Sequence, residues 1–228
     1  NDAFSDFKSW YFSKPLITRS YLTGVFILAA LVSLGITSPY SLIHSFEDTF
    51  MKFQIWRAIT AGSSWASSPS HTVLNVFRVH LFEQNLNQIF SKDTYADFLW
   101  LVSWLGLVLI VLTSFLPMYI YSNAFLMAIT YIYCKRRPHE EFSLMFGFKS
   151  KVHFIFNLGG YFPFIWTALK VLLFGESLLP NLVGLGLGHL YIFLKDIMVI
   201  SHHKDYLATP QFIKNWWYRG SSQRVQAP

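Results

Sequence analysis

Long runs of hydrophobic residues, separated by short polar stretches, dominate the sequence. A bilayer core of about 30 Å needs about 20 apolar residues in one helix, and six segments approach that length. They cover residues 18–37, 71–90, 98–115, 118–134, 152–174 and 182–201. The pattern predicts an all-α membrane protein with six transmembrane helices. Residues 18–201 would form the membrane domain, between an N-terminal segment, 1–17, and a C-terminal tail, 202–228.

The composition agrees with this prediction. Hydrophobic residues make up 53% of the 228 residues and charged residues only 13%, whereas a soluble domain averages about 25% charged residues. So little charge cannot cover a soluble protein, which excludes a cytosolic globular enzyme and a nucleic-acid-binding protein. The single cysteine, Cys134, excludes an intramolecular disulfide framework and a cysteine-based zinc site. We expect no metal and no cofactor.

The lysines and arginines predict the orientation in the membrane. With six spans, both termini lie on the same side, and most lysines and arginines outside the spans fall on that side. Lys52 and Arg57 fall on the other side. Because cytosolic loops carry the excess of basic residues, we expect both termini to be cytosolic.

Residues 38–70 form a long loop on the non-cytosolic side, which we call loop one. It is rich in large apolar side chains: Phe46, Phe50, Phe53, Ile55, Trp56 and Trp65. Two interpretations are open, a solvated loop with an aromatic belt and an element partly inserted at the interface. In the second, Trp56 and Arg57 anchor the loop, because tryptophan prefers the headgroup level and a guanidinium binds several carbonyls at once.

The second segment, 71–90, carries a polar helix face. His71, Asn75, Arg78 and Asn85 fall on this face, together with Phe82. A charge at the bilayer centre costs about 2.5–3.5 kcal/mol on insertion scales, unless it faces protein or water. The segment is either a cytosolic loop or the lining of a hydrophilic substrate groove, and we favour the groove.

The sixth segment contains closely spaced glycines and a histidine. Gly184 and Gly188 lie one turn apart on one face, a spacing that lets a neighbouring helix approach closely. His189 falls in the middle of the segment, where a histidine is either a packed hydrogen-bonding residue or a catalyst.

Five short motifs, taken in order, resemble the Derlin family. They are PLITR at 15–19, QIWR at 54–57, YFP at 161–163, GHLY at 188–191 and TPQF at 209–212. The resemblance implies a rhomboid-like fold in the endoplasmic reticulum membrane. It also implies a role in retrotranslocating misfolded proteins for degradation, across a bilayer thinned by short spans.

The kinship with rhomboids raises a protease alternative. Rhomboid proteases use a serine in a Gly-x-Ser-Gly motif and a histidine on the sixth span. Here Ser122 falls near the nucleophile position and His189 at that of the base. Ile120 and Asn123 replace the two motif glycines, and bulky Tyr191 follows the histidine, so a close serine–histidine contact is disfavoured. The resemblance therefore implies a pseudoprotease without catalytic residues.

The resemblance also implies partners. These are misfolded protein substrates, a membrane ubiquitin ligase complex, the lipid bilayer and a cytosolic AAA+ unfoldase. Residues 220–228 contain no glycine-rich unfoldase-binding box, so we expect an indirect link to the unfoldase. A small-molecule transporter is disfavoured, because the sequence shows no inverted repeat with broken helices.

Overall fold

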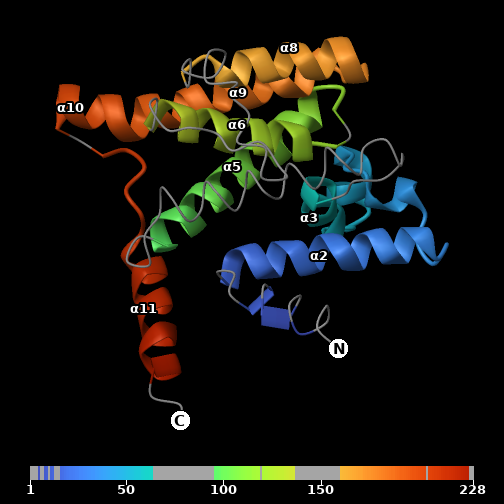
Figure 1. The fold of residues 1–228 in the computed structure, drawn as a ribbon, viewed down its shortest axis with the longest axis horizontal. Coiled ribbons are helices and arrows are strands. Elements are labelled where there is room, and N and C mark those ends of the chain that lie inside the picture. Colours follow the sequence, from blue (N-terminus) through green and yellow to red (C-terminus); the bar gives the residue numbers. More distant parts are fainter. Residues whose placement is uncertain are drawn as a thin grey trace. The chain divides into compact units, whose positions relative to one another are not determined.

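The computed structural model describes residues 5, 8–9, 11–12, 16–63, 95–118, 120–136, 160–203 and 205–225. All regular secondary structure within these residues is helical (Figure 1), which confirms the predicted all-α class. The chain separates into two compact units, each built from segments distant in sequence. One comprises Asn1–Asn87 and Ile110–Ser122, and the other Gln88–Leu109 and Asn123–Pro228. The linear division at residues 17 and 201 remains a prediction.

The first unit contains helix α2 (Leu16–Ser33) and the short helices of loop one. These are the 3-10 helix η1 (Pro39–Leu42), the π-helical turn η2 (Glu47–Met51) and α3 (Trp56–Ser63). Helix α2 ends four residues before the predicted boundary at residue 37. Gly35 has a φ of 69°, a left-handed conformation that ends a helix and that glycine adopts without strain.

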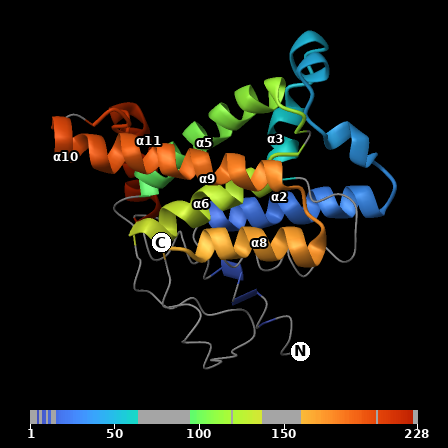
Figure 2. The same ribbon diagram turned by 90° about the horizontal axis from the view of Figure 1, so that it is seen from above.

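The second unit is a helical bundle. Helix α5 (Tyr95–Phe115) begins in it, and α6 (Ser122–Arg136), α8 (Phe162–Phe174) and α9 (Leu178–Ile192) lie side by side (Figures 1 and 2). The other helices are η4 (Phe193–Ile197), α10 (Met198–His202) and α11 (Gln211–Val225).

Helix α6 is the core of this bundle, because every residue from 124 to 134 is buried. Met127 and Tyr131 of α6 form a cluster with Leu185 of α9, against which Trp166 and Ile192 pack. A helix buried on all sides must be covered by apolar neighbours. Helix α6 thus provides the surface on which Trp166 of α8 and Leu185 of α9 pack.

Helix α5 has two different faces. Phe98, Leu101 and Leu105 are buried at helical spacing, whereas Leu107 and Phe115 are 65% and 82% exposed. In water such exposure of large apolar residues on a long helix is unfavourable. It is the arrangement expected of a helix that meets lipid on one side.

Two helices among the described residues are long and apolar enough to cross a bilayer, Tyr95–Phe115 and Leu178–His202; Phe162–Leu173 is a shorter apolar helix. The six predicted spans are therefore represented only in part. The second span, 71–90, lies outside the described residues, as do residues 152–159 of the fifth.

The predicted boundaries of the fourth and sixth spans were wrong by four residues each. Helix α6 begins at Ser122 rather than at residue 118, since Pro117 separates it from α5. The sixth helix begins at Leu178 rather than at residue 182, and η4 joins α9 to α10 in one continuous helix. The end of α8 at Phe174 is as predicted, because Gly175 has a φ of 64°.

Candidate functional site

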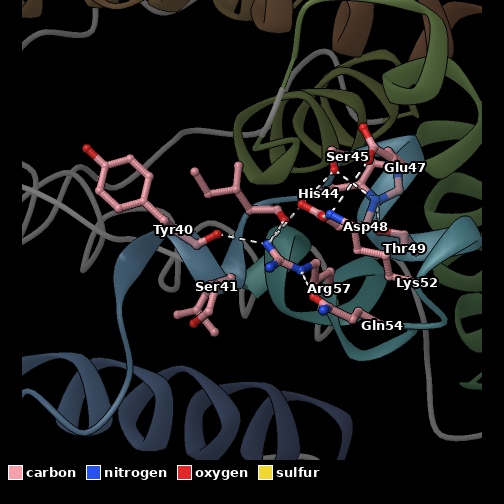
Figure 3. A network of polar contacts seen from close by, with 12 residues as sticks. Tyr40, Ser41, His44, Ser45, Glu47, Asp48, Thr49, Lys52, Gln54 and Arg57 are labelled. Atoms are coloured by element: carbon pink, nitrogen blue, oxygen red, sulfur yellow. Dashed lines mark hydrogen bonds and ion pairs between the residues drawn. The ribbon is translucent and has the colours of Figure 1, made fainter.

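Arg57 holds loop one together (Figure 3). Its Nη1 donates to the backbone carbonyls of Tyr40 at 2.8 Å and Ile43 at 3.0 Å, and its Nε donates to Oε1 of Gln54 at 2.5 Å. The side chain is only 13% exposed and lies 3.8 Å from Oδ2 of Asp48. One guanidinium thus joins η1 to the start of α3, as its planar set of donors permits.

A second polar contact fixes the turn between η1 and η2. Oγ1 of Thr49 and Nδ1 of His44 lie 2.8 Å apart, and both side chains are buried. Burial lowers the pKa of His44, and the backbone at Ile110 opposes this shift only in part. The buried ring therefore favours its neutral form.

Asp48 lies at the exposed end of the same network. It accepts hydrogen bonds from Lys52 at 2.8 Å and from Ser45 at 3.0 Å. These bonds lower the pKa of the Asp48 carboxyl, and the partnership raises the pKa of Lys52. Arg57 lies on the inner side of Asp48, so this carboxylate faces two cations.

Trp56 and Arg57 are consecutive in α3 but lie in different environments. Trp56 is 55% exposed, whereas Arg57 is largely covered. Other large apolar side chains of loop one are also exposed: Tyr40, Phe46, Phe50, Met51, Phe53 and Ile55. We call these residues, together with Trp56, the apolar rim. In the described part of loop one, residues 38–63, a polar centre holds the backbone, and large apolar side chains around it are exposed. Trp65 lies outside the described residues.

The four groove residues predicted from the sequence, His71, Asn75, Arg78 and Asn85, all lie outside the described residues. The groove itself stays a prediction.

Gly184 and Gly188 face α6 at close range. A Cβ added to Gly188 would lie 2.8 Å from the Ala128 carbonyl oxygen and 2.9 Å from Cβ of Tyr131. A Cβ on Gly184 would collide with the Ala124 backbone and with Met127. Gly186, between them, has nothing within 4 Å of its Cβ position. Only the two predicted glycines thus lie in the contact between α9 and α6.

His189 contacts the same helix through a tyrosine. Its Nδ1 lies 2.9 Å from the hydroxyl of Tyr131, and the two rings meet edge to face. Phe164 of α8 also meets the Tyr131 ring, at a centroid distance of 6.2 Å. Ser122 is buried at the first position of α6.

The sequence reasoning missed a buried ionic cluster in the second unit. Lys170 lies 3.5 Å from Glu176, and both side chains are 4% exposed. Lys170 also donates to Oδ1 of Asn181, and Asn123 donates to Glu176 at 3.1 Å. The cluster joins α8, α9 and the start of α6. The sequence feature that could have revealed the cluster is Lys170 itself, because a charged residue inside an apolar segment is usually paired or functional.

A third set of ion pairs surrounds η4. Lys195 donates to Asp205 at 2.6 Å, and Arg136 of α6 donates two hydrogen bonds to Asp196. Both charges of η4 are thus paired. These ion pairs explain how the sixth helix continues past Lys195 and Asp196, the charged residues that end its uncharged segment.

Comparison with known proteins gives a consistent result. A sequence model of the Der1-like family matches residues 14–211. Derlin-1.1 of Zea mays is 30% identical over 211 residues, which cover 90% of this chain and 82% of the relative. Derlin-2.2 of Arabidopsis thaliana is 27% identical, over 91% of this chain and 86% of the relative. The probable derlin-2 homolog of Dictyostelium discoideum is 24% identical, over 92% of this chain.

Proposed function

The chain belongs to the Der1-like family, and on that premise we propose that it is a non-catalytic factor of endoplasmic-reticulum-associated degradation. It would help misfolded proteins cross the endoplasmic reticulum membrane toward the cytosol, where both of its termini lie. Six rhomboid-like spans would surround a polar groove lined by His71, Asn75, Arg78 and Asn85. Its partners would be a membrane ubiquitin ligase complex and a cytosolic AAA+ unfoldase.

The observation that carries the proposal is the construction of loop one. Arg57 ties the backbone at Tyr40 and Ile43 to α3, so the apolar rim is held on a fixed frame. An apolar rim of this kind favours the boundary between headgroups and acyl chains. There it can meet apolar segments that a misfolded chain exposes and can displace lipid next to the groove.

The length of helix α8 supports the proposal that the protein thins the bilayer around it. Helix α8 has 13 residues, which at about 1.5 Å per residue gives about 20 Å. This length falls short of the about 30 Å bilayer core. A short span thins the bilayer around it, which lowers the cost of moving unpaired backbone groups through the membrane.

The contact between α6 and α9 supports a non-catalytic role. Where Gly184, Gly188 and His189 of α9 meet α6, the neighbouring residues are Ala124, Met127, Ala128 and Tyr131. The α6 side chain that meets the His189 ring is a tyrosine, whereas a rhomboid protease uses the histidine of this span as the base of its serine.

Turnover of a lumenal misfolded substrate in cells tests the proposed function. Trp56→Ala with Arg57→Ala should slow turnover strongly, while protease protection shows that membrane insertion is intact. Trp56→Ala alone should slow it as well, and this variant keeps the Arg57 hydrogen bonds, so a folding defect is not the cause. Lys52→Ala, an exposed change in the same loop, is the matched control. Normal turnover in both Trp56 variants would refute the proposal.

The groove is tested separately. Arg78→Leu or Asn75→Leu, which replace a polar group by an apolar one, should slow turnover of the same substrate. Asn215→Leu in α11 is the control for an Asn-to-Leu exchange outside the groove. Unchanged turnover in both groove variants would remove the groove from the mechanism.

A further inference from the structure

Helix α11 has an exposed aromatic face. Phe212 is 70% exposed and Trp216 is 68% exposed. Residues four apart lie on the same side of a helix, so the two rings form one apolar patch. Trp217, on another side, packs edge to face on Tyr95 at the start of α5, with 5.9 Å between ring centroids. The helix therefore has one side held by the bundle and another side left open.

The charge of α11 identifies what the open side meets. The helix contains Lys214, Arg219 and Arg224 and no acidic residue. Aromatic side chains with basic residues on one short helix are the composition of helices that lie in the headgroup layer of an anionic membrane. An acidic protein surface would satisfy the charges, but it would gain less from two exposed rings, one of them a tryptophan.

The position of α11 in the chain brings it to the bilayer. The helix Leu178–His202 has 25 residues, about 37 Å at 1.5 Å per residue, which exceeds the about 30 Å core. It ends at His203, whose φ of 52° is left-handed. The end of this helix therefore reaches the headgroup layer, and α11 starts only eight residues after His203.

The chain between the two helices is held, so α11 cannot swing far from that layer. Lys195 donates to Asp205 at 2.6 Å and to the Leu207 carbonyl at 3.1 Å. Thr209 donates to Asp97 of α5, and the side chains of Leu207 and Thr209 are buried. The start of α11 is thus fixed at the same end of the bundle as the start of α5.

We propose that α11 is a membrane-surface helix that inserts Phe212 and Trp216 among anionic lipid headgroups and binds them through its basic residues. This inference does not rest on the proposed degradation function, because it needs only the bundle and a bilayer.

The test uses the full-length protein in vesicles. Cys134 is buried, so a thiol-reactive environment-sensitive dye labels a cysteine introduced by Trp216→Cys or, on another side of α11, by Gln211→Cys. Vesicles contain either phosphatidylcholine alone or phosphatidylcholine with phosphatidylserine, each with a lipid-borne quencher. We expect several-fold stronger quenching and a shorter emission wavelength at position 216 than at 211. Quenching at 216 should rise with phosphatidylserine and fall with salt.

Two further variants separate the electrostatic contribution to lipid binding from the apolar one. Lys214→Gln with Arg219→Gln should remove the dependence on phosphatidylserine, and Phe212→Ser should weaken quenching at position 216 in both kinds of vesicle. Asn215→Ser, an exposed polar position, is the matched control and should change neither. Equal quenching at 211 and 216, or no effect of phosphatidylserine, would overturn the proposal. Shielding of position 216 only when co-purifying proteins are present would overturn it in favour of a protein partner.

Discussion

The hydroxyl of Tyr131 on α6 lies 2.9 Å from Nδ1 of His189 on α9. This contact joins two helices through residues 58 positions apart, directly beside the Gly188 approach. It gives the histidine a hydrogen-bonding role in packing.

Ser122 should therefore be dispensable. Ser122→Ala is expected to leave substrate turnover unchanged, and a fluorophosphonate probe should not label Ser122, because Ile120 and Asn123 replace the glycines of the rhomboid motif and the His189 ring contacts Tyr131. Tyr131→Phe should lower the free energy of unfolding by about 1 kcal/mol through the lost hydrogen bond. Tyr161→Phe, at an exposed tyrosine, is the control. Probe labelling of Ser122, or lost turnover in Ser122→Ala, would favour the rhomboid-type protease alternative.

The three glycines of α9 should respond differently to the same substitution. Gly188→Ala and Gly184→Ala should each lower stability by about 1–3 kcal/mol, because the added methyl group meets the α6 backbone. Gly186→Ala has open space and should be neutral or stabilising by up to about 1 kcal/mol, since alanine favours helix more than glycine does. Thermal unfolding in detergent measures all three. A loss at Gly186 equal to that at Gly188 would contradict the close packing of α9 on α6.

The buried Lys170–Glu176 pair should show strong coupling. Lys170→Met leaves the Glu176 carboxylate buried without this cation and should cost about 3–5 kcal/mol of unfolding free energy. Lys170→Met with Glu176→Gln should cost clearly less than the sum of the two single changes, because both charges leave together. Lys52→Met, at the exposed pairs with Glu47 and Asp48, should cost far less than Lys170→Met, because solvent screens these charges. Additive effects in the double-mutant cycle would argue against a buried pair.

Acid should weaken loop one through His44. The pKa of His44 is lowered in the folded protein, so the unfolded chain binds the proton more readily. The stability contributed by the neutral ring is present above the ordinary histidine pKa of about 6.5 and is lost as the pH falls below it. The protection factors of the amides at residues 40–60, which are corrected for the fall of the intrinsic exchange rate with pH, should therefore decrease between neutral pH and pH 5. In His44→Gln this decrease should be much smaller, and an unchanged decrease would assign it to another group.

Local features of the fold were predictable from sequence where one residue decides the outcome. The end of α8 follows from Gly175, and the break before α6 follows from Pro117. The exposed and covered roles of Trp56 and Arg57 follow from the different chemistry of their side chains. In each case the cause lies within a few residues of its effect.

Contacts between helices were not predictable in this way. The pairing of Tyr131 with His189 depends on how far α6 is rotated and shifted against α9, which hydrophobic periodicity does not specify. The Lys170 cluster was missed because one lysine scarcely changes the hydrophobicity of the segment that contains it. Its partners, Glu176 and Asn181, lie on the far side of a turn, and Asn123 lies on another helix.

The burial of α6 has a consequence for how the protein is made. Helix α6 is not among the described helices that are long and apolar enough to span a bilayer, and it carries Asn123, Thr130, Lys135 and Arg136. A translocon that tests each nascent segment against lipid would release such a helix slowly or not at all. Helices α8 and α9, which cover α6 in the finished bundle, are synthesised after it. We therefore expect α6 to stay at the insertion site until the C-terminal helices emerge from the ribosome.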